Sequence, residues 1–387
     1  MRIFVTDGDA RAALAITRSL GAQGHTVVVS ASERRSIAGA SRYCAAEYAQ
    51  PPAQDGPKAL AVAFAAIVAR AEPDVVIGVT DRSLTVLHRL PPEVAGRRMP
   101  PPDAGRYTAA SDKAELFALC LKEGIETPRG VVADGGCVPP RDDLATLGSP
   151  LIVRPALSWR AEGGRWIQGS VSYEADRDAL ARRVDTDQAL RAPYLVQEKI
   201  SGEGCGLFLL AHEGRIVVAF SHRRLREKPP SGGVSTLCAS AAVPDDLLDP
   251  ARRFAKALRW SGLAMLEFKR DHRSGRPLLL EVNARPWGSL ALASAAGLDF
   301  PGDLVRLTQG AEPRSLAFRE GVRLRWWWGD VDHFYLLEKE AGRSGSRAMM
   351  FALAKAVVAG PVAEAWDTFR RDDPLPFLAE TRAWVLR

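Results

Sequence analysis

The pattern of apolar and polar residues near the amino terminus predicts strands that alternate with helices. Short apolar runs at residues 2–6, 26–30 and 75–79 have the length of buried strands, and apolar residues recur at helical spacing over residues 10–20. Alternating strands and helices are typical of a parallel α/β sheet. We therefore predict an N-terminal parallel α/β domain over residues 1–108.

A second region begins at Asp112, where the pattern changes. Asp112 is suited to cap an amphipathic helix that ends at Gly124. The elements predicted beyond it are typical of an α+β region: strands at 129–132, 150–154, 194–199, 206–211 and 215–221, and helices at 174–184 and 246–260. We predict a small lobe over residues 109–193, a large lobe over 194–312 and a mainly helical extension over 313–387.

A predicted hairpin in the large lobe carries the most informative polar residues. Its strands, 263–269 and 277–283, are joined by DHRSG, which contains the Asp, Ser and Gly expected of a turn. Glu267 lies in the first strand, and Glu281 and Asn283 share one side of the second because side chains alternate along a strand. Two carboxylates and an amide oxygen are hard ligands of the kind that Mg²⁺ prefers. The hairpin therefore predicts a magnesium site.

An alternative interpretation is that the two glutamates form ordinary cross-strand ion pairs with Lys269 or Arg276 on a solvated face. Arg285, two residues beyond Asn283, favours the metal site. A guanidinium at that position is suited to stabilise charge on a phosphoryl group during transfer.

Glu267 together with the run Glu281-Val282-Asn283-Ala284-Arg285 resembles the metal-binding signature of the ATP-grasp superfamily, and the resemblance extends over roughly residues 1–310. It implies an N-terminal pre-ATP-grasp domain and a two-lobed ATP-grasp core. It also implies ATP and Mg²⁺ as cofactors, with Mn²⁺ as a possible substitute for Mg²⁺.

The resemblance also implies which residues contact the nucleotide: Lys113, Arg154, Glu198, Lys199, Ile200 and Glu203. The first two would hold phosphates, the next three would form an interdomain hinge whose backbone reads adenine, and the last would accept the ribose hydroxyls. A glycine-rich loop that closes over the phosphates in this superfamily corresponds to residues 158–164, which are bulkier and contain fewer glycines.

A basic run precedes a Pro-Pro-Ser-Gly-Gly turn and comprises Arg223, Arg224, Arg226 and Lys228. A solvated face or a nucleic-acid patch is the alternative, but the run lacks the interleaved aromatic residues that nucleic-acid binding favours. We expect Arg226 to bind an anionic substrate or acyl phosphate, with residues 231–235 lining the pocket. This segment resembles a predicted carboxylate–amine ligase group that includes D-aspartate ligases.

The resemblance implies an ATP- and magnesium-dependent ligase that joins a small carboxylate to an amine through an acyl phosphate, with Arg226 and Arg285 as catalytic residues. The alternatives are an ATP-grasp kinase or carboxylase that acts on a small carboxylate, and a non-catalytic nucleotide-binding module. Intact metal ligands argue against the non-catalytic module. A homodimer is a further possibility.

Composition narrows the class of protein. Hydrophobic residues make up 47% and charged residues 25% of the chain, as in ordinary globular proteins. The five cysteines form no CxxC pair, so we predict neither a zinc site nor a disulfide framework, which suits the cytoplasm. The net charge of +6 suits polyphosphate binding, and we expect no nucleic acid partner.

No apolar run reaches the roughly 20 residues that a membrane-spanning helix needs. The amphipathic segment 345–359 could instead lie on a membrane surface or on a partner protein. We expect it to pack as a helix against the main body of the protein.

Overall fold

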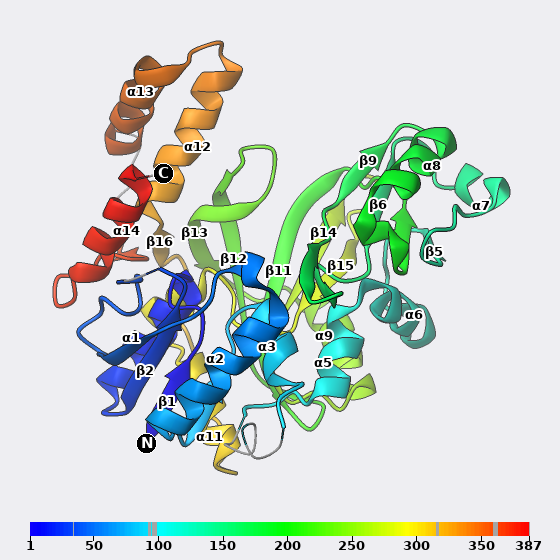
Figure 1. The fold of residues 1–387 in the computed structure, drawn as a ribbon. Coiled ribbons are helices and arrows are strands. Elements are labelled where there is room, and N and C mark those ends of the chain that lie inside the picture. The colour runs from blue at the N-terminus through cyan, green and yellow to red at the C-terminus, as the bar shows by residue number, and fades with distance from the viewer. Residues whose placement is uncertain (34, 92–93, 95–98, 315–316, 359–362, 387) are drawn as a thin grey trace.

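The computed structural model describes residues 1–33, 35–91, 94, 99–314, 317–358 and 363–386 (Figure 1). The chain begins with a four-stranded parallel sheet in the order β3-β2-β1-β4. Its strands are β1 (Arg2–Val5), β2 (Thr26–Ala31), β3 (Cys44–Ala49) and β4 (Val75–Ile77). The predicted parallel α/β fold of this region is thereby confirmed. The pattern did not predict β3, whose sequence CAAEYA lacks an apolar run and which is only partly buried.

Helices cover both faces of this sheet. They are α1 (Arg11–Ala22), α2 (Gly56–Ala71), which follows the short helix η1 (Ala53–Asp55), and α3 (Asp81–Leu87). Leu14 of α1 packs against Ile3 on one face, and Phe64 of α2 packs against Phe4 on the other. Because both faces are buried there, β1, β2 and β4 consist largely of apolar residues.

The next region contains a second four-stranded sheet, in the order β5-β10-β6-β9. Its strands are β5 (Gly130–Ala133), β6 (Leu151–Pro155), β9 (Ser172–Glu174) and β10 (Tyr194–Gln197). The helices of this region are α5 (Ala104–Ser111), α6 (Lys113–Glu123), α7 (Arg141–Ala145), α8 (Arg177–Thr186) and the short η2 (Gln188–Arg191). Asp112 caps α6, as predicted, because its Oδ1 accepts hydrogen bonds from the N–H groups of Ala114 and Glu115. Gly124 ends the helix with a φ of 65°.

A seven-stranded sheet forms the centre of the molecule, in the order β15-β14-β11-β12-β13-β16-β17. Its strands are β11 (Gly202–His212), β12 (Arg215–Lys228), β13 (Val234–Ala241), β14 (Gly262–Asp271), β15 (Pro277–Asn283), β16 (Arg323–Arg325) and β17 (Ala365–Trp366). All neighbours are antiparallel except β16 and β17. The predicted hairpin over residues 263–283 is confirmed as β14 and β15.

The two faces of the central sheet pack against different parts of the chain. One face contributes Phe208 and Phe220 to a core shared with the N-terminal domain and with α10 (Leu290–Ala296) and α11 (Phe300–Thr308). The other face packs Leu207 and Phe268 against α9 (Asp245–Ala257). The first face therefore lies against the N-terminal domain, and polar residues farther along it form the site described below.

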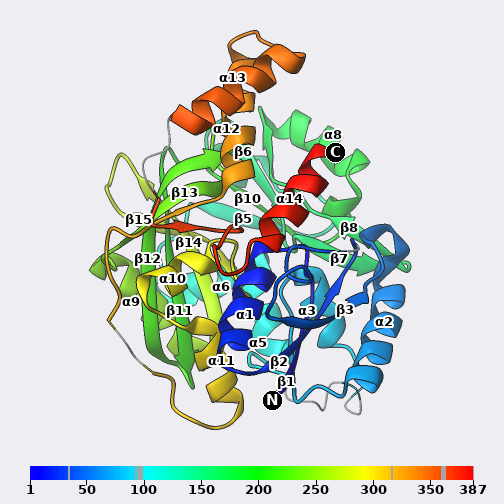
Figure 2. The same ribbon diagram turned by 90° about the vertical axis from the view of Figure 1, so that its left-hand side faces the viewer.

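The C-terminal extension combines helices with the two last strands of the central sheet. Its helices are α12 (Trp327–Glu340), α13 (Gly345–Val358) and α14 (Leu375–Val385). Figures 1 and 2 show the α12–α13 hairpin projecting from the molecule and α14 lying beside the N-terminal domain. We expected α13 to pack against the main body, but it packs against α12, through Ala352 and Ala356, within this projecting hairpin. None of the helices that the structure describes is long and apolar enough to cross a membrane.

Candidate functional site

Glu267 and Glu281 face each other directly across β14 and β15, and Met265 faces Asn283 in the same register. The β-carbons of directly opposed residues lie about 4.5–5.5 Å apart, so the two carboxylates share one small space. Arg276 pairs with Glu126 instead of with either glutamate, and the glutamates pair with arginines from other strands. The alternative of ordinary cross-strand ion pairs within this hairpin is therefore wrong.

Glu281 is held by two cations from the neighbouring lobe. Its Oε2 lies 2.7 Å from Arg154 Nη2 and 3.8 Å from Lys113 Nζ. Burial alone would raise the pKa of Glu281, but the charges of Arg154, Lys113 and Arg285 outweigh it and hold that pKa below its ordinary value. Burial also lowers the pKa of the Lys113 ammonium, against the opposing effect of Glu281. The structure thus brings two of the predicted phosphate-binding residues to the predicted metal site.

Glu267 has a different partner, Arg224 of β12. Arg224 Nη2 donates to Glu267 Oε1 over 2.8 Å, and the pair is about three-quarters or more buried, with side-chain exposures of 14% and 24%. Burial by itself lowers the pKa of Arg224, and the Glu267 and Glu227 carboxylates more than reverse that effect. Arg224 belongs to the basic run noted in the sequence, but no feature of the sequence distinguished it from its neighbours.

Arg226, the residue of that run expected to bind substrate, points elsewhere. A register shift between Arg224 and Arg226 changes the direction in which the two side chains project from β12. Arg226 Nε donates to Asp330 Oδ1 of α12 over 3.0 Å, and Arg325 binds the same carboxylate. Arg226 therefore holds the C-terminal extension, and the structure does not bring it to Glu267 and Glu281.

Arg285 joins the hairpin to the N-terminal domain. Its Nε donates to Asp81 Oδ2 over 2.9 Å, and its Nη2 donates to Asn283 Oδ1 over 3.1 Å. The Tyr107 hydroxyl also donates to Asp81, over 3.3 Å. Asp81 begins α3, which follows β4 of the first sheet after a short connection, so the N-terminal domain contributes to the orientation of Arg285.

A small cavity lies where these elements meet. Its lining includes Asp81, Tyr107, Lys113, Ser158, Glu281 and Asn283. Lys113 Nζ donates to Ser158 Oγ over 3.2 Å, which ties the lysine to the segment that corresponds to the phosphate loop. The cavity therefore connects the N-terminal domain, the small lobe and the hairpin.

The segment from residue 158 to 164 folds as part of a tight hairpin. Strands β7 (Trp159–Glu162) and β8 (Arg165–Gln168) pair through a turn of Gly163 and Gly164, whose φ angles are 56° and 77°. The turn rests on Gly56 at the start of α2. A β-carbon on Gly56 would lie 2.1 Å from the carbonyl oxygen of Gly164, so this contact requires a glycine.

The predicted hinge lies between two sheets. Glu198, Lys199 and Ile200 connect β10 of the small sheet to β11 of the central sheet. The N–H of Glu198 donates to the carbonyl of Arg129, and its carboxylate pairs with the Arg129 side chain at 2.8 Å. Within the described parts of the chain, the N–H groups of Lys199 and Ile200 have no hydrogen-bond partner.

Glu203 lies on the other face of the central sheet from Glu267. Glu203 is opposite Arg270, whereas Gly204 and Gly206 are opposite Lys269 and Glu267, and side chains alternate between faces. Gly204 therefore faces the site, where a β-carbon would lie 3.3 Å from Arg224 Nη1. The structure does not bring Glu203 to the other site residues, because its register reverses the expected direction of its side chain.

The oxygen atoms of the hairpin fit a divalent cation. Glu267 Oε2 and Glu281 Oε1 accept no hydrogen bond from any residue in the described ranges, whereas the other oxygen of each carboxylate is bound by an arginine. No three His, Cys, Asp or Glu side chains cluster as metal ligands among these residues, and the third candidate ligand here is the amide oxygen of Asn283. The donor set is thus all oxygen and incomplete without further ligands.

Comparisons with known proteins agree with this architecture. Residues 191–329, which include the hinge, Arg224 and the hairpin, match the family described as "ATP-grasp in the biosynthetic pathway with Ter operon". No curated protein sequence matches significantly.

Solved structures are similar over most of the chain. A biotin carboxylase complex from Campylobacter jejuni is 16% identical over 83% of this chain and 74% of its own, with a TM-score of 0.64. An L-amino acid ligase from Bacillus licheniformis is 17% identical over 81% of this chain and 75% of its own, with a TM-score of 0.58. A D-alanine–D-alanine ligase from Bacillus anthracis is 17% identical over 80% of this chain and 97% of its own, with a TM-score of 0.53. The chain therefore has the ATP-grasp fold, and its residues 191–329 match an ATP-grasp family.

Proposed function

We propose that the chain is an ATP- and magnesium-dependent ligase that joins a small carboxylate to an amine through an acyl phosphate. The observation that carries this proposal is that Glu267 and Glu281 face each other among cationic side chains, each with one carboxylate oxygen that accepts no hydrogen bond from the described residues. These cations are Lys113, Arg154, Arg224 and Arg285. Such a cluster suits a metal-bound polyphosphate better than a neutral ligand.

Glu267, Glu281 and Asn283 would hold Mg²⁺, which neutralises phosphate charge and bridges phosphate oxygens when it is bound. Arg154 and Lys113 now share Oε2 of Glu281, and both are within reach of the same space. We infer that they turn from the carboxylate toward the phosphates when nucleotide binds. Their burial is consistent with this role, because a buried cation needs an anionic partner in either state.

The hinge supports the nucleotide assignment. The N–H groups of Lys199 and Ile200, which lack protein partners in the described structure, can donate to ring nitrogens of adenine. Glu198 stays paired with Arg129, which fixes the start of the hinge. The sequence resemblance predicts Glu203 as the ribose contact. Its position on the opposite face of the sheet from Glu267 does not support that role.

Arg285 and Arg224 are placed to stabilise negative charge near the transferred phosphoryl group. Asp81 and Asn283 orient Arg285, and Glu267 orients Arg224. No nucleophilic side chain is required, since positioning and charge stabilisation supply most of the catalysis in phosphoryl transfer. Arg226 could contact substrate only if its hydrogen bonds to Asp330 opened. We therefore prefer Arg224 as the arginine of the basic run that contacts the substrate or acyl phosphate.

The decisive experiment measures ADP release while carboxylates and amines are varied. We expect release only when both are present, and we expect hydroxylamine to trap the acyl phosphate as a hydroxamate. ADP release with a carboxylate alone would identify a kinase, and release with bicarbonate would identify a carboxylase, as in the biotin carboxylases of similar fold. Nucleotide binding without turnover under all conditions would support a non-catalytic module. The proposed homodimer is tested by light scattering of the purified protein.

A further inference from the structure

The C-terminal extension exposes most of the large apolar side chains that reach the surface. Of the sixteen large hydrophobic residues that are exposed in the described chain, nine lie between residues 350 and 386. The exposure is therefore concentrated in a small part of the 387-residue chain. Apolar side chains that gather on one surface mark a place where another body binds.

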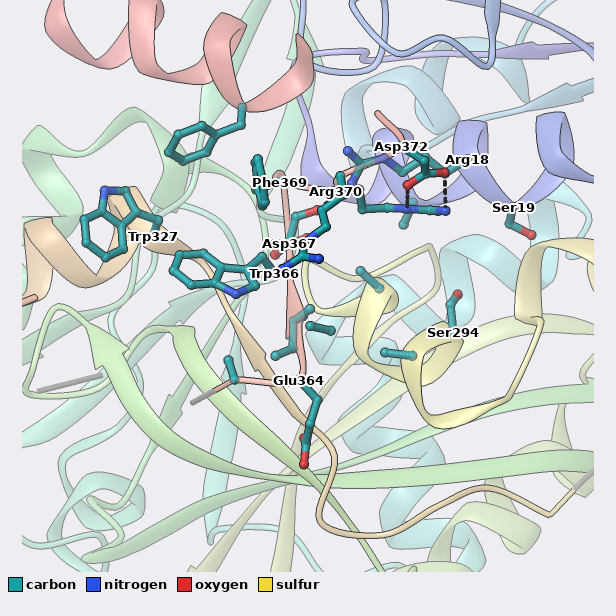
Figure 3. Close-up of a pocket in the computed structure, with 18 residues that line it drawn as sticks. Arg18, Ser19, Ser294, Trp327, Glu364, Trp366, Asp367, Phe369, Arg370 and Asp372 are labelled. Atoms are coloured by element: carbon teal, nitrogen blue, oxygen red, sulfur yellow. Dashed lines mark hydrogen bonds and ion pairs between the residues drawn. The ribbon is translucent and has the colours of Figure 1, made fainter. Parts of the chain in front are cut away.

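One of the nine, Phe369, lies on the inner side of the extension. Figure 3 shows it near Trp366 in the wall of a cavity of about 960 Å³ between the extension and the N-terminal domain. The other eight line no part of that cavity, and we call them the outer apolar residues. They are Met350, Phe351, Val357 and Val358 on α13, and Leu375, Leu378, Val385 and Leu386 on or directly after α14.

The packing of α13 buries its small residues and exposes most of its large ones. Ala348, Ala352 and Ala356 are fully buried, and their spacing of four residues places them on one face of the helix. Met349 and Leu353 are partly buried beside that face, which packs against α12. Four of the six large apolar residues of α13 thus remain exposed. Because burial is more favourable for larger apolar area, this orientation leaves the better binding face for a partner outside the chain.

The outer apolar residues lie on a protruding part of the molecule. Figure 1 shows α13 and α14 at the end of the molecule opposite α7 and α8, with α13 on the projecting hairpin. Figure 2, turned by 90°, shows both helices on the side that faces the viewer. A protruding surface built from two helices suits an extended partner rather than a small molecule, which binds in a concave site.

The exposed charges of α13 and α14 are all basic. They belong to Arg347 and Lys355 on α13 and to Arg382 on α14. Glu380, the one acidic residue in the sequences of these two helices, is turned inward and accepts hydrogen bonds from two side chains of the extension. The charges around the outer apolar residues therefore favour an anionic partner.

Neighbouring acids do not cancel these positive charges. In the described parts of the chain, no acid pairs with Arg347 or Arg382. Lys355 pairs with Glu338 of α12, but Arg343 binds the same carboxylate, so two cations share one acid. The positive charge at this end of the extension thus exceeds the negative charge.

We propose that the outer faces of α13 and α14 bind the surface of an anionic phospholipid bilayer. The outer apolar residues would enter the boundary between headgroups and acyl chains, and Arg347, Lys355 and Arg382 would lie beside the lipid phosphates. Apolar side chains combined with bases are typical of helices that lie in a membrane interface. The outer apolar residues include no Tyr or Trp, which protein interfaces favour. This surface is separate from the proposed nucleotide site, and its binding does not depend on ATP.

Sedimentation of the full chain with lipid vesicles, in the absence of nucleotide, tests this proposal. One set of vesicles contains phosphatidylcholine alone, and the other contains equal parts of phosphatidylcholine and phosphatidylglycerol. We expect the partition coefficient to be at least about tenfold larger for the anionic vesicles, because each base near an anionic surface adds to the attraction. No binding to the anionic vesicles, or equal binding to both sets, would overturn the proposal.

Two matched variants locate the surface. Val357→Glu places an acid among the outer apolar residues and is expected to lower the partition coefficient at least about tenfold. Val62→Glu makes the same change on α2 and is expected to alter it less than about twofold. The two valines are similarly exposed, at 66% and 63%. Circular dichroism checks that both variants fold, and equal partition of the two would exclude this surface.

A further variant and a second measurement distinguish the bilayer from another occupant. Arg382→Gln should lower partition to anionic vesicles about fivefold, since it removes one base, and should leave partition to neutral vesicles unchanged. Light scattering without lipid shows whether Val357→Glu dissociates a dimer. If it does, and the wild type does not bind vesicles, the surface is an interface between two copies of the chain and the proposal is wrong.

Discussion

Arg224 donates a 2.8 Å hydrogen bond to Glu267, whereas Arg226, beyond a shift in strand register, binds Asp330 of the C-terminal extension. The two arginines come from one basic run of the sequence and have different partners. One contributes to the candidate site, and the other attaches α12 to the central sheet. The register shift therefore determines which cation reaches the carboxylates.

Replacing Arg224 with alanine should lower kcat/KM of the proposed ligase about 10- to 100-fold, since a hydrogen bond to a charged group contributes about 1.5–3 kcal/mol. Arg223→Ala is the matched control, because Arg223 is exposed and its side chain projects from the other side of β12. Steady-state kinetics with varied ATP and carboxylate gives both values. Equal losses in the two variants would show that Arg224 acts only through overall charge.

Replacing Glu281 with glutamine should weaken Mg-ATP binding by at least about tenfold, because the change removes a charged metal ligand next to Arg154 and Lys113. Glu203→Gln should change it less than about twofold, since Glu203 lies on the opposite face of the sheet. Calorimetric titration of each variant with Mg-ATP measures the difference. A larger loss in Glu203→Gln than in Glu281→Gln would restore the ribose contact expected from the sequence and argue against the metal assignment.

His222 should make folding stability dependent on acidity. Burial, followed by the charge of Arg224, lowers its pKa to about 3 from an ordinary value near 6.5. The unfolded chain therefore binds a proton that the folded chain excludes, and stability falls as the pH drops from 6.5 toward 3, by up to about 1.4 kcal/mol per pH unit. His222→Leu should remove this contribution to the slope.

Chemical denaturation at a series of pH values measures that slope. Above about pH 7 both states of His222 are neutral, so the difference in unfolding free energy between the two proteins should be constant there. Parallel curves for the wild type and His222→Leu below pH 6 would contradict the prediction.

The close contact between Gly56 at the start of α2 and Gly164 in the β7–β8 turn predicts an effect on both stability and ATP binding. Gly56→Ala should displace the β7–β8 hairpin, because the new β-carbon would lie 2.1 Å from the carbonyl oxygen of Gly164. Gly24→Ala is the matched control, since Gly24 has a similar φ of 83° but no described residue lies within 4 Å of its β-carbon position. Both should lose about 1–2 kcal/mol of stability from backbone strain. Only Gly56→Ala should also raise the KM for ATP and expose the hairpin to proteolysis.

Local patterns predicted the elements that follow a clear apolar periodicity, but they did not predict β3, β7, β8, β9 or β13. The helix after Asp112 begins and ends where its capping residues indicate, and the β14–β15 hairpin forms around its turn residues. The sequence did not predict β16 and β17, which are 3 and 2 residues long. Such short strands exist through pairing with a distant partner, and no local pattern encodes them.

The sequence by itself determined that Glu281 and Asn283 share one side of a strand, because side chains alternate locally. Glu267 faces Glu281 because the register shifts between Glu267 and Phe268, and regular pairing from the turn would have placed Glu267 opposite Leu280. It also identified Lys113 and Arg154 as cations for this site through a family resemblance. Only the tertiary structure decided that Arg224 rather than Arg226 reaches the carboxylates, that Glu203 lies on the opposite face, and that Asp81 orients Arg285. Those outcomes depend on strand register and on contacts between residues distant in the chain, and a one-residue change of register reverses the direction of a side chain.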